Sequence, residues 1–398
     1  MDILTQRFRL LLGSSDIKFK RGLSYKINWN ARGVCIEGAR GTGKSTMMLQ
    51  YIKQNLPLDQ TLYVSLDDLY FRQNNLVEVA ERFYGLGGRH FFLDEVHKYA
   101  DWQTAVKNIY DFLPEMKLVI SGSSILALQH SRADLSRRML NYHLPELSLR
   151  EYLSLKHLTE MPIYGFEEIL NNHADIAEEL RKIIASPLKS LNDYFTYGAY
   201  PFFLEGESDY FMRINQLINV IIDYDLPEAK ALEVATLAKL KKLMYVLSTA
   251  VPFTPNISKL AEQVDTSRVR LLEMLHILEQ AQLIHNLRSA SYGTSLMNKP
   301  EKIYLHNTSL IGALAEGKPD IGNMRETFFL SQVQNSGAVV TYPKAGDFMV
   351  NGKYLMEIGG INKKGKQIRG HEKAYIVADD LEYGFGNKIP LWLFGFLY

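Results

Sequence analysis

The chain has 398 residues, of which 46% are hydrophobic and 22% charged, as expected for a globular protein with substantial apolar cores. Its formal net charge of +1 excludes a global field that attracts nucleic acid or a membrane surface, so any such binding must come from a local patch. At about 100–200 residues per domain, this length predicts two to four domains.

Cysteine content and apolar run length indicate the compartment. The single cysteine, Cys35, excludes an intramolecular disulfide and favours a reducing environment. It lies in the apolar run Val34-Cys35-Ile36, which predicts a buried core residue. The first residues do not have a signal-peptide pattern, and no apolar run reaches the ~20 residues that span a bilayer. We therefore expect a cytoplasmic protein that does not bind membranes.

Residues 1–150 alternate short apolar runs with helical patterns. The apolar runs predict strands at Gly33–Glu37, Thr61–Ser65, His90–Asp94 and Lys117–Ser121. Strands that alternate with helices are typical of βαβ units. The sequence therefore predicts an α/β domain with a parallel sheet.

The first strand runs into a complete phosphate-binding motif. The pattern G-x-x-x-x-G-K-[ST] is matched by Gly38, Ala39, Arg40, Gly41, Thr42, Gly43, Lys44 and Ser45. Glycines allow backbone amides to approach phosphates, and the following helix adds its N-terminal amides. The Lys44 ammonium is expected to bridge the outer phosphates, the Ser45 hydroxyl to ligate Mg²⁺, and Thr46 to contact an inner phosphate.

An acidic pair ends the third predicted strand. Asp94 and Glu95 follow the apolar run Phe91-Phe92-Leu93, and carboxyl strand ends of an α/β sheet gather ligands. We expect Asp94 to bind the same Mg²⁺ as Ser45, and Glu95 to orient and deprotonate the attacking water.

Small polar residues end the fourth predicted strand, at Ser121, Gly122, Ser123 and Ser124. Ser123 is a candidate for phosphate contact, although a polar turn fits the pattern equally well. Arg137 and Arg138 follow, and an arginine here could neutralise transition-state charge from the same chain or from a neighbouring one.

The segments GARGTGKST, FFLDEVHKYADWQTAVKNIYD, LVISGSS, LSRRML and LPELSLREYL together resemble bacterial and archaeal AAA+-type ATPases of the STAND-like branch. The resemblance implies ATP and Mg²⁺ as ligands, a hydrolase activity, and catalytic roles for Lys44, Glu95 and Arg138. Arg137 stands where the family has glycine. The resemblance also implies a C-terminal region of unknown function.

The remaining chain predicts three further segments. Residues 151–235 have helical patterns and are interpreted as a lid. Residues 236–305 contain a helix-turn-helix pattern followed by a strand, which resembles a winged helix, with Asp265 or Thr266 as the expected cap of its second helix. Ser267, Arg268 and Arg270 would contact DNA, but the nearby glutamates would oppose phosphates and favour a protein-interaction or intramolecular module of the same shape.

Residues 306–398 resemble a small α+β domain of the restriction-endonuclease-like fold. Glu326, Asp347 and Glu357 match its acidic positions, and a helix is expected around Gln367. Asp347 and Glu357 form a possible second metal site. The lysine expected two positions after Glu357 is replaced by Gly359, which favours an inactive structural or nucleic-acid-scanning domain over an active nuclease. Lys363 or Lys364 could substitute for the missing lysine.

Three functions remain open from the sequence. The first is an ATPase domain, residues 1–150, whose hydrolysis drives a conformational switch coupled to DNA or to a protein partner. The second is a metal-dependent nuclease that the ATPase domain gates. The third is a scaffold that binds ATP without turnover.

Overall fold

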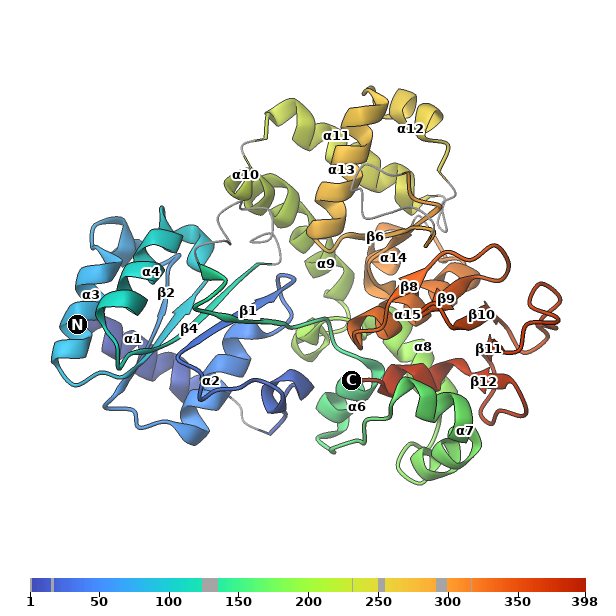
Figure 1. Ribbon diagram of the computed structural model, residues 1–398, viewed down its shortest axis with the longest axis horizontal. Coiled ribbons are helices and arrows are strands. Elements are labelled where there is room, and N and C mark those ends of the chain that lie inside the picture. Colours follow the sequence, from blue (N-terminus) through green and yellow to red (C-terminus); the bar gives the residue numbers. More distant parts are fainter. Residues whose placement is uncertain are drawn as a thin grey trace. The chain divides into compact units, whose positions relative to one another are not determined.

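The computed structural model describes residues 2–15, 18–123, 135–230, 232–249, 255–290, 299–315 and 317–398 (Figure 1). The chain forms two compact units. Unit 1 contains Met1–Glu146 and Asp223–Leu232, and unit 2 contains Leu147–Ile222 and Glu233–Tyr398. The finer division at residues 150, 235 and 305 stays a prediction.

Unit 1 is built on a five-stranded parallel sheet with the strand order β2-β3-β4-β1-β5. Its strands are β1 (Gly33–Gly38), β2 (Thr61–Ser65), β3 (His90–Asp94), β4 (Lys117–Ser123) and β5 (Leu140–His143). The predicted α/β fold and its first four strands are confirmed. These four are buried along most of their length because helices cover both faces, whereas β5 is largely exposed and has no continuous apolar run.

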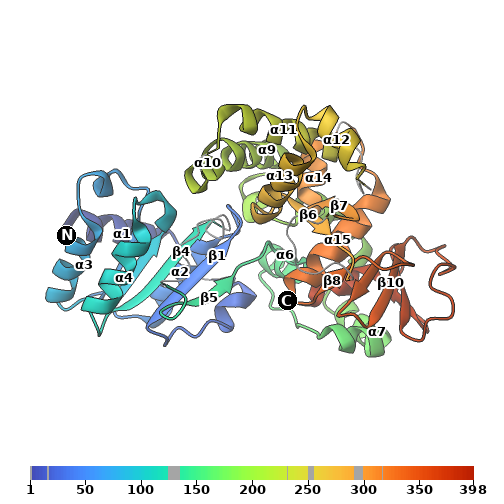
Figure 2. The same ribbon diagram turned by 45° about the horizontal axis from the view of Figure 1, so that its top comes forward.

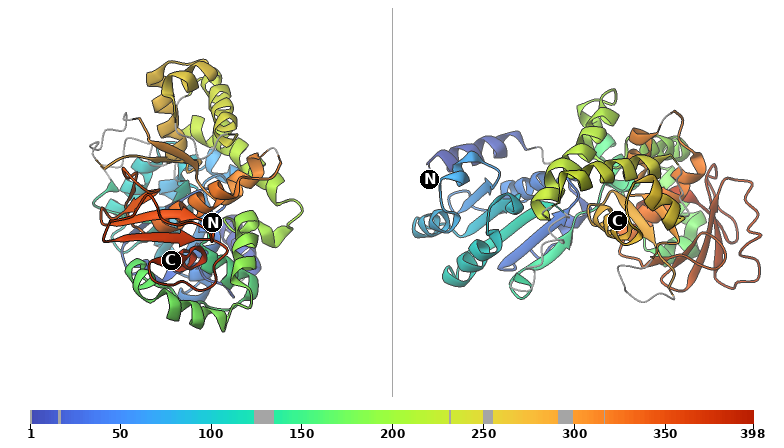
Figure 3. Two further views of the ribbon diagram at one scale, coloured as in Figure 1. Left: turned by 90° about the vertical axis from the view of Figure 1, so that its right-hand side faces the viewer. Right: turned by 90° about the horizontal axis from the view of Figure 1, so that it is seen from above.

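The helices of unit 1 form two layers. Its α-helices are α1 (Asp2–Ser14), α2 (Lys44–Asn55), α3 (Leu76–Gly85), α4 (Trp102–Phe112) and α10 (Leu226–Ala229), with 3₁₀ turns at Gly22–Tyr25, Leu69–Arg72 and Val96–Lys98. Helix α1 packs on β2 and α2, and α3 packs on α4, so that the two pairs flank the sheet (Figure 3). Cys35 is 5% exposed in the core between these layers, as predicted.

The strand order determines which loops meet. Strand β4 lies between β1 and β3, and in the register Gly38 pairs with Ser123 and Leu93 with Ile120. All five strands are parallel, so their carboxyl ends share one edge of the sheet. The phosphate loop after β1 and the acidic pair that ends β3 therefore lie at that edge.

Unit 2 is helical in its first half. Its α-helices are α6 (Leu149–His157), α7 (Phe166–Arg181), α8 (Pro187–Tyr197), α9 (Tyr210–Val220), α11 (Val234–Ser248), α12 (Ile257–Gln263), α13 (Arg268–Gln280), α14 (Thr308–Leu314) and α15 (Ile321–Asn335). Two further helical segments are the 3₁₀ turn Pro201–Glu205 and the π-helical turn Ile221–Asp225, which leads back to unit 1. A capping box of Ser148 and Glu151 fixes the start of α6.

The pair α12–α13 is followed by the antiparallel strands β6 (Ile284–Leu287) and β7 (Lys302–Leu305). The side chain of Ser267 caps α13 by accepting a hydrogen bond from the Arg270 amide, so the expected cap at Asp265 or Thr266 is wrong. Asp265 has a left-handed φ of 55° and belongs to the turn before the cap. The winged helix itself stays a prediction.

Unit 2 ends in a mixed five-stranded sheet with α15 packed against it (Figure 2). Its strands are β8 (Val340–Thr341), β9 (Phe348–Val350), β10 (Tyr354–Gly359), β11 (Ala374–Ala378) and β12 (Lys388–Pro390), followed by a 3₁₀ helix, Leu391–Phe396. The helix expected around Gln367 is absent, because residues 361–370 form turns that include Gly365 and Gly370 at positive φ. No helix of the described residues is both long and apolar enough to cross a membrane.

Candidate nucleotide site

The phosphate loop has the backbone that its glycines predict. Gly41 and Gly43 have φ values of 80° and 93°, which L-residues with side chains rarely adopt. A Cβ atom on Gly38 would lie 2.3 Å from the Leu144 carbonyl oxygen, so this position also requires glycine. Helix α2 begins directly after Gly43, which directs its N-terminal amides at the loop.

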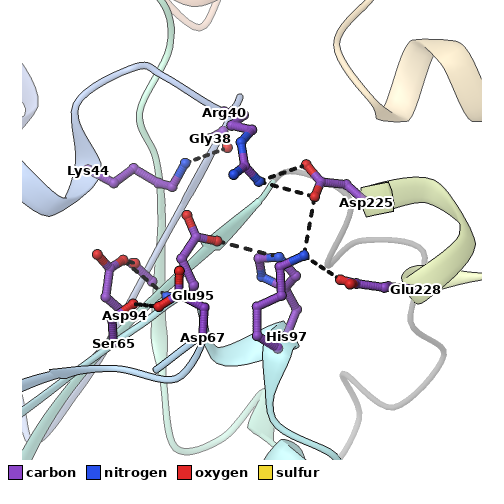
Figure 4. Close-up of polar contacts among 12 residues, drawn as sticks. Gly38, Arg40, Lys44, Ser65, Asp67, Asp94, Glu95, His97, Asp225 and Glu228 are labelled. Atoms are coloured by element: carbon purple, nitrogen blue, oxygen red, sulfur yellow. Dashed lines mark hydrogen bonds and ion pairs between the residues drawn. The ribbon is translucent and has the colours of Figure 1, made fainter. Parts of the chain in front are cut away.

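Lys44 is buried inside the loop. Its ammonium donates hydrogen bonds to the carbonyl oxygens of Gly38 (3.0 Å) and Ala39 (2.9 Å), as Figure 4 shows for Gly38. Burial lowers the pKa of Lys44, and the neighbouring Glu95 and Asp94 oppose that shift. The Lys44 ammonium therefore lies at the place where the motif requires a cation that contacts the phosphates.

Arg21, a residue outside the motif, clamps the loop. Its side chain is 5% exposed and donates to the carbonyl oxygens of Thr42 (2.5 Å), Pro145 (2.7 Å) and Glu146 (3.2 Å). Thr42 is further fixed by its own hydroxyl, which donates to Ala39 O at 2.9 Å. The loop is therefore connected to the segment that follows β5.

Asp94 lies at the centre of a buried hydroxyl network. Its carboxylate accepts hydrogen bonds from the hydroxyl of Tyr63 (2.5 Å) and from that of Ser121, and from the Glu95 amide at 3.1 Å. The Tyr63 hydroxyl also interacts with the Ser45 side chain. Burial raises the pKa of the Tyr63 phenol, with Asp94 adding to the shift, so this group remains a donor. Tyr63 consequently links Asp94 to Ser45, the two predicted magnesium ligands.

Glu95 follows Asp94 with a left-handed backbone, φ 50°, that turns its side chain out of the strand. Its carboxylate lies 3.4 Å from Nε2 of His97 (Figure 4). Burial raises the pKa of Glu95, whereas Lys44 opposes the shift. Burial, with a smaller contribution from Lys98, lowers the pKa of His97 to about 4, so this imidazole is neutral near pH 7. The Glu95 carboxylate therefore lies beside a neutral imidazole ring.

A second ionic group lies next to the loop. Arg40 donates to both carboxylate oxygens of Asp225, at 3.2 and 3.4 Å (Figure 4). The Lys98 ammonium lies 3.4 Å from Asp225 and 2.5 Å from Glu228. Asp225 is 1% exposed. Asp225 and Glu228 are far from the loop in sequence and carry no motif, so only the fold reveals them.

The other predicted residues divide into two groups. Ser123 is buried and lies in register with Gly38, next to the loop, whereas Thr46 is exposed on α2. Arg138 lies elsewhere: its carbonyl oxygen adjoins Gly33 at the amino end of β1, and its guanidinium donates to Asp111 with two bonds of 2.8 Å. The structure therefore does not bring Arg138 to Lys44 within unit 1. Ser124 lies outside the described residues.

The acidic residues of unit 2 gather as well. Glu357 lies on β10 and Asp347 directly precedes the neighbouring strand β9, where it accepts a hydrogen bond from the Ile358 amide at 2.8 Å. Lys302 lies 3.3 Å from Glu326 and 3.8 Å from Asp347. Burial, followed by the charge of Asp347, raises the pKa of Glu326, which also accepts a bond from the Tyr304 hydroxyl at 2.6 Å.

Lys363, one of the two lysines that the sequence offered as a substitute, lies beside Glu357. Its ammonium lies 3.3 Å from Glu357. Its methylene carbons lie only 2.7–3.1 Å from the position that a Cβ atom on Gly359 would occupy. Glu357 is 2% exposed, and its Oε2 accepts no hydrogen bond from the described residues. The glycine therefore makes room for a lysine from four positions further along the chain.

Comparisons with known proteins agree with the geometry of unit 1. Residues 30–153 match the family described as AAA domain, and residues 188–320 match a domain of unknown function, DUF8612. The chain is 26% identical over 400 aligned positions to the uncharacterized protein MJ1637 of Methanocaldococcus jannaschii, covering 92% of this chain and 84% of that one.

Two solved structures resemble parts of the chain. One, on katanin self-assembly, is 17% identical, covers 42% of this chain and 57% of its own, and has a TM-score of 0.26. The other, PCH-2 from C. elegans, is 14% identical, with coverages of 47% and 56% and a TM-score of 0.26. The chain thus spans a little over half of these two chains.

Phosphate loop, parallel sheet and acidic strand end together define the class of P-loop nucleotide-binding domains. Within that class, the family match over residues 30–153 supports an ATPase of the AAA type. The AAA-type resemblance seen in the sequence is confirmed at this level. The STAND-like branch and the restriction-endonuclease-like domain stay predictions.

Proposed function

We propose that unit 1 binds ATP with Mg²⁺ and hydrolyses it. The observation that carries the proposal is the meeting of Lys44, Asp94 and Glu95, from two separate loops, at one edge of the sheet. Lys44 neutralises the outer phosphates, and Glu95 deprotonates the attacking water. The AAA-type match favours adenine over guanine nucleotides.

The donor set beside the loop fits Mg²⁺, which prefers oxygen ligands. Asp94 is a buried carboxylate, and the Ser45 hydroxyl is linked to it through Tyr63. These two side chains would hold the ion, which neutralises phosphate charge when bound. Tyr63 and Ser121 orient Asp94 by donating to it.

The backbone amides of Gly38, Ala39, Arg40, Gly41, Thr42 and Gly43 surround the phosphates in this proposal, and Thr46 and Ser123 lie at its border. Arg138 lies at the amino end of β1, so it can act as a catalytic arginine only on the nucleotide of a second copy of the chain. Its contribution therefore depends on assembly of the ATPase.

Hydrolysis drives a conformational switch in this proposal. The helical lid and the winged helix would respond to the nucleotide, and α13, which begins with Arg268 and Arg270, would contact DNA or a protein partner. Arg270 is paired with Glu273 at 2.8 Å, so its charge is partly compensated, which leaves both kinds of partner open.

Phosphate release measured with and without duplex DNA tests the function. We expect Lys44→Ala to abolish ATP binding, and Glu95→Gln to bind ATP but to lower turnover by about 10²-fold or more. Lys53→Ala is the matched control, because Lys53 lies on the same helix and donates to Ser15 O instead. ATP binding without phosphate release in the unmutated protein would leave only the scaffold function.

We propose a metal-dependent nuclease site in unit 2 as a second candidate. It is favoured by the carboxylates of Glu357 and of Asp347, which is bonded to the Ile358 amide next to Glu357, and by the Lys363 ammonium beside Glu357. The candidate predicts Mg²⁺-dependent cleavage of duplex DNA that Asp347→Ala and Lys363→Ala both abolish. Lys364→Ala is the control, and absence of cleavage with and without ATP would reject this candidate.

A further inference from the structure

The segment 223–232, here called the return segment, brings a buried carboxylate to the phosphate loop. Asp225 is 1% exposed and pairs with Arg40 of the loop and with Lys98, three residues after Glu95. Glu228 adds a second carboxylate on Lys98 at 2.5 Å. All these residues belong to unit 1, so the contacts lie within one compact unit.

The return segment cancels the positive charge at the loop. Four cations lie in or beside the loop, Arg21, Arg40, Lys44 and Lys98, together with two acids at the same edge, Asp94 and Glu95. These six groups have a net charge of plus two. Asp225 and Glu228 reduce this net charge to zero, which disfavours an anionic ligand.

The negative charge of Asp225 also acts on the titratable groups next to the phosphate loop. Its charge acts on the pKa of Lys44, Glu95 and His97, in each case in the direction that a nearby anion produces. Because Asp225 is buried, solvent screens this effect much less than it screens a surface ion pair. A phosphate beside Lys44 would experience the same charge as repulsion.

The return segment is also connected to unit 2 at both ends. Helix α9 continues through the π-helical turn Ile221–Asp225 into α10, and the chain re-enters unit 2 at Glu233 before α11. π-Helical turns occur frequently at functional sites. The return segment is therefore continuous along the chain with α9 on one side and with α11 on the other.

We propose that Asp225 competes with the triphosphate for Arg40 and Lys98, so that ATP binding and docking of the return segment oppose each other. The inference rests on the proposed ATP site and adds its regulation. Coupling of this kind is reciprocal: whatever detaches the return segment strengthens ATP binding, and ATP weakens docking by the same factor.

Nucleotide affinity tests the competition directly. Calorimetry with Mg²⁺ and a non-hydrolysable ATP analogue should give a Kd about 5- to 10-fold lower for Asp225→Asn than for the unmutated protein. Glu233→Gln removes the same charge from an exposed residue that makes no side-chain cap hydrogen bond, and should leave the Kd unchanged. An unchanged or higher Kd for Asp225→Asn would overturn the competition.

Cross-linking of the unmutated protein tests docking without any substitution. Lys98 and Glu228 are 2.5 Å apart, close enough for a zero-length carbodiimide cross-link that mass spectrometry can quantify. We expect the ATP analogue with Mg²⁺ to reduce this cross-link severalfold. The pair Lys353 and Glu167, at 2.8 Å in unit 2, is the internal control and should be unaffected. A Lys98–Glu228 yield that does not respond to bound nucleotide would overturn the inference.

The two proposals fail in different ways. If the unmutated protein binds no nucleotide, both the ATP site and its regulation are wrong. If binding is present and Lys44→Ala abolishes it, but neither Asp225→Asn nor the cross-link responds, only the competition is wrong.

Discussion

Removal of Arg21 is expected to destabilise the phosphate loop although the residue lies outside every motif. Arg21→Ala deletes three hydrogen bonds to the carbonyl oxygens of Thr42, Pro145 and Glu146 and leaves these acceptors in a buried site. Hydrogen bonds to charged groups contribute about 1.5–3 kcal/mol each and are not additive, so we expect a loss of about 3 kcal/mol. For a domain of roughly 150 residues this lowers the Tm by about 6–12 °C.

Calorimetric melting of Arg21→Ala beside Arg7→Ala isolates the effect of burial. Arg7 pairs with Asp68 at 2.5 Å, but its side chain is 46% exposed, and such pairs contribute at most about 1 kcal/mol. We expect Arg7→Ala to melt within about 4 °C of the unmutated protein. Arg21→Ala should also bind the ATP analogue more weakly, because Thr42 belongs to the loop. Equal melting temperatures for the two variants would refute the argument that Arg21 clamps the loop.

Three further predictions concern catalysis. Tyr63→Phe removes a hydrogen-bond donor to Asp94 and should weaken the apparent Mg²⁺ affinity by about 10-fold. ATP binding without Mg²⁺ should be unchanged. A Mg²⁺ titration identical to that of the unmutated protein would contradict this role of Tyr63. Burial raises the pKa of Glu95 above its ordinary 4.5, so this carboxylate becomes protonated at a higher pH than an exposed glutamate does. As the pH is lowered, kcat/KM should therefore start to fall before pH 4.5 is reached. A kcat/KM that stays constant down to pH 4.5 would exclude Glu95 as the base. Arg138→Ala and Lys44→Ala should each lose phosphate release, and a mixture of both should regain part of it if Arg138 acts on a second copy; absence of recovery would reject that role.

The sequence predicts most of the candidate nucleotide site because that site is built from local patterns. The first four strands of unit 1 are largely buried and appear as continuous apolar runs, and the glycines of the loop have a fixed spacing. Asp94 and Glu95 directly follow such a run. Each of these signals requires only neighbouring residues, so the parallel sheet and the loop could be derived without coordinates.

The partners of these residues could not be derived, because they come from distant segments. Asp225 is 185 positions from Arg40, and Arg21 reaches Pro145 across 124 positions. Tyr63 has a local sequence that reads as an ordinary apolar strand, and only the pairing of β2 with β3 places its hydroxyl on Asp94. Lys363 likewise has no motif spacing, since residues 361–370 turn back on Gly359 instead of forming a helix.

Burial shifts the pKa values of Lys44 and Glu95 in opposite directions, and the charged residues around them must offset these shifts. Desolvation lowers the pKa of Lys44 and raises that of Glu95, so both groups are shifted toward their neutral forms. An anionic phosphate favours the charged form of Lys44 but disfavours that of Glu95, the base in the proposed hydrolysis. A site that uses both groups therefore needs positive charge close to the phosphate, and Arg40 and Lys98 are the described side chains placed to supply it when Asp225 does not hold them.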